Sequence, residues 1–258
     1  MHIPKRLRLF STRQNDSTAK WTGICCKMPL FKGITMTETI ISGRKCRLFG
    51  SDDPAYILIQ PSARHETPTL EEEATKLAAL TTVPFLLVTV ELEDWIVALM
   101  PWADRNISRD EEAGKHGQET LEYILHELVP WLEQRYGSMP MVLGGYSLGA
   151  LFALWASART DRFHAIAAAS PSVWIKDWIP YAKKNVPQAA AVYLSLGERE
   201  EHVKNQAIAR VGDCLRTQYE LLREQLGEHC TLVWEEGNHF TDNAGRLARA
   251  FAWCLQRM

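Results

Sequence analysis

The sequence lacks both a long hydrophobic run and an excess of charge of either sign. No apolar stretch in its 258 residues reaches the roughly 18 residues that a membrane-spanning helix needs. Lysine and arginine number 29 against 31 aspartates and glutamates, so the formal net charge is −2. A near-neutral chain offers no basic surface for nucleic acid and no electrostatic anchor for anionic lipid. We therefore predict neither a nucleic-acid partner nor a membrane partner.

The sequence also lacks a cysteine pattern that would indicate a metal or redox site. Its six cysteines include no C-x-x-C pair, so neither a zinc site nor a thioredoxin-like motif is predicted. No feature marks the chain as secreted, and we interpret the cysteines as small buried residues in a reducing compartment. These observations predict a cytoplasmic protein.

The beginning of the chain lacks hydrophobic periodicity and acidic residues. Six basic residues stand against the single acid Asp16 in residues 1–27, and no apolar core of a secretory signal is present. We predict that residues 1–33 are a tail or disordered extension, or precede the true start. The remainder, residues 34–258, contains no Gly/Ser- or Pro-rich linker and is predicted to be a single domain.

Beyond residue 34, strand patterns alternate with helix patterns. Residues 35–42 and 44–50 alternate polar with apolar side chains around Gly43, which predicts an antiparallel hairpin. The segment 171–188 fits neither pattern and is a candidate cap or insertion. Buried strands are predicted at 55–61 and 84–92, further strands at 140–145, 163–170, 189–197 and 230–236, and helices at 69–80, 118–136, 148–156, 202–225 and 242–256.

This order predicts an α/β fold with a mostly parallel central sheet, an antiparallel N-terminal hairpin and helices on both faces. Two prolines and one glycine are expected to end or bend these elements. Pro61 is expected to close its strand, Pro130 to kink the helix over 118–136, and Gly137 to end that helix.

The strongest motif is Gly145-Tyr146-Ser147-Leu148-Gly149, a G-x-S-x-G pattern between a predicted strand and a predicted helix. This is the setting of a nucleophile elbow, a tight turn that lifts a serine hydroxyl above the edge of the sheet. Side chains at the two flanking positions would collide with the neighbouring elements, and glycine removes them. Ser147 is the predicted nucleophile, and the amide of Leu148 is aimed at a developing oxyanion.

A serine hydroxyl needs a base to take its proton, and eight histidines compete for that role. His239 is favoured because it follows the last predicted strand, at the same edge of a parallel sheet as Ser147. Gly237 permits the turn that brings its imidazole inward.

An acid should orient the histidine, and Glu198, Glu200 and Glu201 follow the strand before His239. We prefer Glu200 because hydrolase acids commonly stand three residues past the glycine that ends this strand, here Gly197. The other two are first-turn acids of the next helix in this interpretation.

The motifs GGYSLGALFALWA, AAASPSVW, LSLGEREE and GNHF give residues 34–257 a resemblance to the α/β-hydrolases. More narrowly, the chain resembles the esterase branch that includes esterase D and the enterochelin (siderophore) esterases. The resemblance implies serine hydrolysis of esters without a metal or organic cofactor.

The same resemblance implies a second oxyanion donor near Pro61 and Ser62; because proline has no N–H, Ser62 is the expected donor. Some siderophore-esterase relatives work without the acid, so a Ser–His dyad stays open.

Three tryptophans follow buried strands on the predicted catalytic edge, and Trp95, Trp102 and Trp174 could line an acyl or aryl pocket. The predicted function is a serine esterase that cleaves a small-molecule carboxylic ester through an acyl-serine intermediate. Two alternatives stay open: acyl transfer or thioester cleavage on the same fold, and a catalytically silent hydrolase-like binding module.

Overall fold

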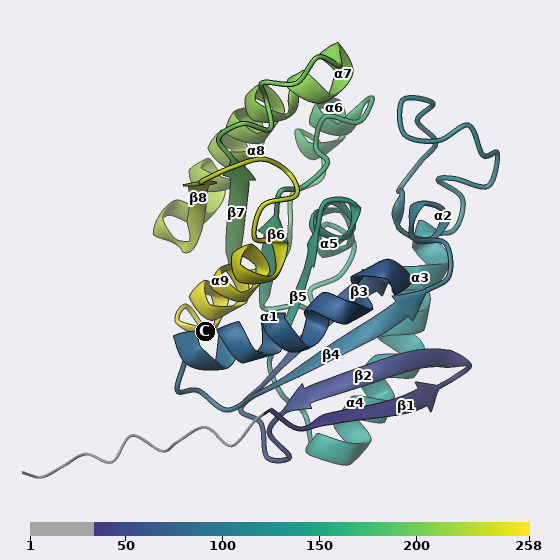
Figure 1. Ribbon diagram of the computed structural model, residues 1–258, viewed down its shortest axis with the longest axis vertical. Helices are drawn as coiled ribbons and strands as arrows, with labels where there is room; N and C mark the ends of the chain where they lie inside the picture. Colours follow the sequence, from purple (N-terminus) through teal and green to yellow (C-terminus); the bar gives the residue numbers. More distant parts are fainter. Residues whose placement is uncertain (1–33) are drawn as a thin grey trace, which may run out of the picture. The chain divides into compact units, whose positions relative to one another are not determined.

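The computed structural model describes residues 34–258, so the predicted tail over residues 1–33 lies outside the described residues. All eight described strands belong to one sheet in the order β1-β2-β4-β3-β5-β6-β7-β8 (Figure 1). The strands are β1 (Met36–Ile41), β2 (Arg44–Gly50), β3 (Tyr56–Ala63), β4 (Phe85–Leu92), β5 (Met141–Tyr146), β6 (Ala165–Ala169), β7 (Ala191–Gly197) and β8 (Cys230–Glu235).

The sheet combines an antiparallel edge with a parallel body, as predicted. β1 pairs with β2, and β2 with β4, in antiparallel register, whereas every pair from β4 through β8 is parallel. Ser42 and Gly43 form the hairpin turn with φ angles of 44° and 84°, a left-handed region that glycine adopts without strain. The predicted fold class is therefore confirmed.

Helices cover both faces of the sheet. On one face α1 and α9 lie side by side (Figure 1), and their apolar residues close one hydrophobic core. On the other face α3, α4, α5 and α8 close a second, larger core. The helices are α1 (Thr67–Leu80), α2 (Trp95–Leu99), α3 (Gly117–Tyr123), α4 (Val129–Tyr136), α5 (Leu148–Ser157), α6 (Trp178–Ala182), α7 (Gln206–Ala209), α8 (Val211–Leu226) and α9 (Asn243–Leu255), with short 3₁₀ turns at Arg64–Glu66 and Gly227–His229.

The helix predicted over residues 118–136 contains a π-helical turn that was not predicted. A π-helical turn over Ile124–Leu128 separates α3 from α4, and the amide of Val129 donates to the carbonyl of Ile124, five residues back. Pro130 follows this π turn, in a backbone that stays helical from α3 into α4. Gly137 ends the helix with a φ of 85°, as predicted, and the kink at Pro130 stays a prediction.

Pro61 does not close its strand, contrary to the prediction. β3 continues to Ala63 and pairs with β4 through Pro61 and beyond. Its pairing with β5 ends earlier, at Ile59 opposite Leu143. The proline therefore occupies a position where one side of the strand has no ladder partner, and its missing donor interrupts no hydrogen bond of the sheet.

The cysteines within the described residues are buried free thiols: Cys46, Cys214, Cys230 and Cys254. They behave as the small buried residues that were predicted, and Cys25 and Cys26 lie outside the described residues. Within residues 34–258, no helix has the length and hydrophobicity required to cross a bilayer. The cytoplasmic location stays a prediction.

Candidate active site

Ser147 lies at the sharp turn between β5 and α5, with a φ of 55° and a ψ of −113°. Its own amide donates to the carbonyl of Ala169 at 3.1 Å, which ties the turn to the end of β6. A Cβ at Gly145 would lie 2.6 Å from the backbone of Gly149, so this glycine is required by packing, as predicted. A Cβ at Gly149 would meet only the carbonyl of Pro61 at 3.5 Å, an ordinary contact rather than the expected collision.

His239 reaches Ser147 from the loop between β8 and α9. Its Nε2 lies 3.1 Å from the Ser147 Oγ. Gly237 has a φ of 97°, and a Cβ there would lie 2.5 Å from the Thr241 hydroxyl. The amide of Asn238 donates to this hydroxyl at 3.1 Å, and the Asn238 side chain accepts from the amide of Phe240 at 2.9 Å. These bonds hold the histidine loop in one conformation.

Glu200 meets the other nitrogen of the imidazole, with 2.7 Å between its Oε2 and His239 Nδ1. An ionised carboxylate only accepts hydrogen bonds, so Nδ1 carries the proton and Nε2 is free to accept one from Ser147. Glu198 is exposed, and Glu201 forms an ion pair with Arg216 at 2.8 Å. Of the three predicted candidates, Glu200 is the one that the structure brings to His239.

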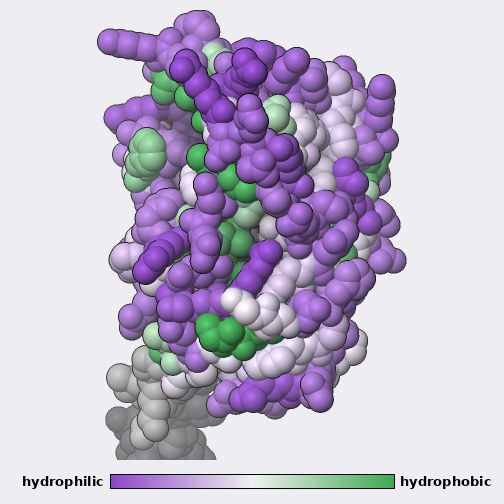
Figure 2. Space-filling view, turned by 90° about the vertical axis from the view of Figure 1, so that its right-hand side faces the viewer, coloured by the Kyte–Doolittle hydropathy of each residue, from purple (hydrophilic) through white to green (hydrophobic). Residues whose placement is uncertain are grey.

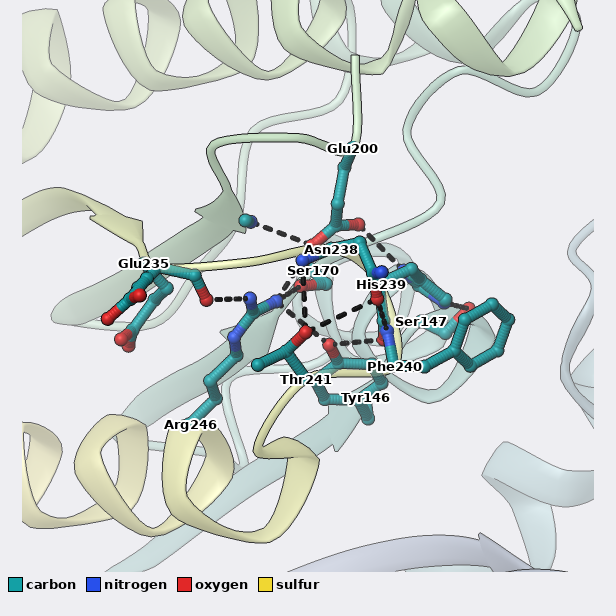
Figure 3. A network of polar contacts seen from close by, with 12 residues as sticks. Tyr146, Ser147, Ser170, Glu200, Glu235, Asn238, His239, Phe240, Thr241 and Arg246 are labelled. Atoms are coloured by element: carbon teal, nitrogen blue, oxygen red, sulfur yellow. Dashed lines mark hydrogen bonds and ion pairs between the residues drawn. The ribbon is translucent and has the colours of Figure 1, made fainter. Parts of the chain in front are cut away.

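A buried arginine on α9 completes this network and was missed by sequence reasoning (Figure 3). Arg246 is 0% exposed, and its Nη1 donates to Glu200 Oε1 at 2.8 Å and to the hydroxyls of Tyr146 and Ser170 at 3.1 Å each. Its Nη2 donates to the carbonyl of Glu236 at 2.9 Å. The arginine thus joins β5, β6, the acid loop and the histidine loop.

The electrostatics of Glu200 favour its ionised form. Burial opposes ionisation, but hydrogen bonds from His239, from the Gly197 amide at 2.7 Å and from the Ser170 hydroxyl at 2.8 Å outweigh it. The pKa of Glu200 therefore lies below its ordinary value. A carboxylate held ionised in this way is suited to stabilise an imidazolium.

Ser172 is a second residue that sequence reasoning did not assign. Its hydroxyl lies 3.2 Å from the Ser147 Oγ, and its amide donates to the Ser147 carbonyl at 3.2 Å. The residue belongs to the motif SPSVW, which carried the resemblance, but a serine in a loop gives no signal of which partner it will meet. The segment 171–188, predicted as a cap, thus contributes directly to the surroundings of Ser147.

The amide of Leu148 opens α5, where the first amides of a helix have no intrahelical partner. The placement of Ser62 argues against its predicted role as second donor, since it lies inside β3 and its hydroxyl donates to the Val90 carbonyl at 3.4 Å. The Ile57 amide donates toward β5, to Pro140 at 3.1 Å, and amides along a strand alternate between its two sides. Ser62 therefore faces β4, away from the elbow.

Two cavities adjoin Ser147 and His239, and Phe240 lines both. The larger, about 550 Å³, lies against the start of α1 and α9, and Trp95 is on its wall. The smaller, about 320 Å³, has an apolar wall that includes Trp174. Figure 2 shows hydrophobic residues in a recess on one face of the molecule, bordered by hydrophilic residues.

Trp102 lines neither cavity, contrary to the prediction. Its Nε1 donates to the carbonyl of Lys176 at 2.8 Å, and its ring stacks on Trp178 and packs against Tyr181. Trp102 therefore packs against the segment 171–188. Within residues 34–258, no group of His, Cys, Asp and Glu side chains is arranged to hold a metal ion; that the reaction needs no metal or cofactor stays a prediction.

The family comparison agrees with this geometry. Residues 70–251 match the protein family described as "Putative esterase", which covers most of the chain. The chain therefore belongs to this esterase family. No protein among the curated sequences matches it.

Solved structures share its fold at low sequence identity. The siderophore hydrolase EstB from Aspergillus nidulans is 19% identical with a TM-score of 0.64, over 86% of this chain and 93% of that one. An IroE-like serine hydrolase from Shewanella oneidensis is 13% identical with a TM-score of 0.67, over 86% and 80%. The enterobactin esterase FES from Shigella flexneri is 16% identical with a TM-score of 0.64, over 87% and 60%.

Proposed function

We propose that this protein hydrolyses a small-molecule carboxylic ester through an acyl-serine intermediate on Ser147. The observation that carries the proposal is the continuous hydrogen-bonded chain from Ser147 through His239 to Glu200, at 3.1 and 2.7 Å. The first residue of this hydrogen-bonded series, Ser147, is held on a strained turn, and the first amide of helix α5 lies beside it.

In the first half of the reaction, Ser147 Oγ attacks the ester carbonyl carbon while His239 Nε2 takes its proton. The amide of Leu148 donates to the oxyanion that forms, and Glu200 stabilises the imidazolium. The tetrahedral species collapses to the acyl-serine, and the departing alkoxide leaves as the alcohol with the proton from His239. A water molecule then attacks the acyl-serine with His239 as base, and the free acid and Ser147 are released.

Labelling with a fluorophosphonate tests this proposal, because the reagent modifies only an activated serine. We expect phosphonylation at Ser147 in the wild type and none in Ser147→Ala. Ser138→Ala, which removes an exposed hydroxyl elsewhere, should label as the wild type does. Release of free acid from p-nitrophenyl butyrate without added alcohol or thiol distinguishes hydrolysis from acyl transfer. Absence of label in the folded wild type would indicate a silent binding module instead.

A further inference from the structure

The larger cavity beside Ser147 is strongly acidic. Its wall includes the carboxyl groups of Glu66, Glu72, Glu73 and Asp242. Among the described residues that line it, none is a lysine or an arginine. A cavity with acidic walls and low-dielectric surroundings concentrates cations.

Two of these acids already have cationic partners, and two do not. Lys76 lies 2.8 Å from Glu72 and 2.6 Å from Asp242, and Arg249 also pairs with Asp242 at 3.1 Å. Neither Glu66 nor Glu73 forms an ion pair within residues 34–258. Glu66 Oε2 accepts the amide of Ala63 at 2.7 Å. The two acids of the cavity that lack an ion pair therefore lie on α1 and in the short 3₁₀ turn just before it.

Glu73 is the least satisfied of the four. The residue is 3% exposed, and its Oε2 accepts a hydrogen bond from Gln60 Nε2 at 3.3 Å. Its Oε1 has no partner in the described part of the chain, and neither has the Oε1 of Gln60, which is also 3% exposed. Two buried polar oxygens on the wall of one cavity thus lack a hydrogen-bond partner, an arrangement that is costly unless a ligand supplies one.

The titration of Glu73 agrees with this geometry. Burial raises its pKa to about 8, the Gln60 hydrogen bond opposes the shift, and the neighbouring charge of Glu66 adds to it. The other titratable groups on the cavity wall are Glu66, Glu72, Asp242, His65, His239 and Tyr146. A cation that entered beside Glu73 would favour its carboxylate form and recover the stabilisation that burial has removed.

We propose that this cavity binds the protonated primary amine of an aminoalkyl ester, whose apolar part occupies the smaller cavity on the other side of Ser147. An ammonium group brings three N–H donors, which suit the orphan oxygens of Glu73 and Gln60. The rings of Trp95 and Phe240 on the same wall are suited to a cation. This proposal rests on the esterase function proposed above.

Two matched pairs of esters test the ammonium site, one with the amine on the alcohol part of the ester and one with the amine on the acyl part. One pair is 4-aminobutyl benzoate and butyl benzoate, and the other is phenyl 6-aminohexanoate and phenyl hexanoate. In at least one pair we expect the kcat/KM of the ammonium ester to exceed that of its neutral partner by about 10- to 100-fold, as charge-assisted hydrogen bonds provide. Equal values in both pairs, or a preference for the neutral ester, would overturn the proposal.

Variants on α1 locate the effect. Glu73→Gln should reduce the ratio of the two kcat/KM values to within about threefold of unity, because the ionisable partner is gone. Glu71→Gln changes an exposed acid of the same helix outside the cavity and should keep the wild-type ratio. A fall in both rates with the ratio unchanged would mean that Glu73 has only a structural role and would contradict the proposal.

A measurement on the wild type keeps the test independent of folding in the variants. Butylamine should slow fluorophosphonate labelling of Ser147 at concentrations where butanol does not, and equal protection by both would overturn the ammonium site. Failure of the two proposals can be told apart. If Ser147 is labelled and neutral esters are hydrolysed without a preference for ammonium esters, only the ammonium site is contradicted. If Ser147 is not labelled and no ester is hydrolysed, the esterase function is contradicted.

Discussion

The two cavities beside Ser147 share a catalytic centre but differ in chemistry. The larger is built from the start of α1 and the loop before α9 and carries four carboxyl groups. The smaller is built from the segment after β6 and from α7 and α8, and Trp174, Val203, Ile208 and Val211 form its apolar wall. Because Ser147, His239 and Phe240 line both, one reaction centre can select two unlike parts of one substrate. Selectivity thus resides in the connecting segments, whereas the chemistry resides at the strand ends.

Ser147→Ala should abolish hydrolysis of esters that bind in either cavity, since every substrate needs the same nucleophile. We expect kcat to fall on the order of 10⁴- to 10⁶-fold for esters with charged and with apolar groups alike. The melting temperature should change little, because the hydroxyl contributes only the contacts to His239 and Ser172. Residual activity within tenfold of the wild type on any ester would contradict the assignment of the nucleophile.

Glu200→Gln should be the next largest effect and should also act on both kinds of substrate. The amide keeps the shape of the carboxyl but removes the charge that fixes the His239 tautomer and stabilises its imidazolium. A loss of roughly 10²- to 10⁴-fold in kcat is expected, with KM little changed. Glu198→Gln and Glu201→Gln are the matched controls and should stay within about fivefold. Small losses in all three variants, measured on one ester at pH 8, would indicate a Ser–His dyad.

The acidic cavity should reveal itself in the pH dependence of stability. The folded-state pKa of Glu73 is raised to about 8, so the native protein holds a proton that the unfolded chain releases at a lower pH. Its contribution to stability is therefore present below the unfolded pKa and is lost as the pH rises toward 8. Glu73→Gln should remove this loss, and the unfolding free energy relative to wild type should improve by roughly 2 kcal/mol between pH 6 and pH 8.

Chemical denaturation at both pH values measures this change. Glu71→Gln on the same helix should show no such pH-dependent difference, since its side chain is exposed. A constant difference between Glu73→Gln and wild type across this range would contradict the raised pKa.

Trp174→Ala should produce the smallest effect and should alter the apolar cavity alone. The ratio of kcat/KM for p-nitrophenyl octanoate over p-nitrophenyl acetate should fall about tenfold, because a long acyl chain loses contact with the ring. Trp102→Ala is the control, since this ring lines neither cavity and packs on Trp178 and Tyr181. An equal change of the ratio in both variants would mean that the segment 171–188 has moved as a whole.

Sequence patterns were sufficient to predict the fold class and the three residues of the hydrogen-bonded series Ser147–His239–Glu200. Ser147, Glu200 and His239 each follow a strand of the parallel part of the sheet, and the ends of parallel strands meet at one edge. Arg246 escaped prediction because a helical arginine normally reaches solvent, and its burial depends on partners from four separate segments.

The departures within the elements have a similar origin. Pro61 is tolerated in β3 because the ladder to β5 ends at Ile59, and the π turn over Ile124–Leu128 precedes Pro130. Both depend on where a neighbouring element stops or on how a turn widens, which periodicity does not encode. The buried pair on the wall of the larger cavity likewise depends on tertiary packing, which brings Gln60 of β3 to Glu73 of α1.

The four buried thiols give the molecule a set of internal reporters of local opening. Burial raises the pKa of each one, so a thiol-specific reagent reacts only while the surrounding element is transiently detached. Cys214 lies on α8, one turn after the cavity residue Val211, whereas the Sγ of Cys254 on α9 donates to the carbonyl of Ile166 in β6. Reaction at Cys214 therefore follows detachment of α8, and reaction at Cys254 follows detachment of α9 from the sheet.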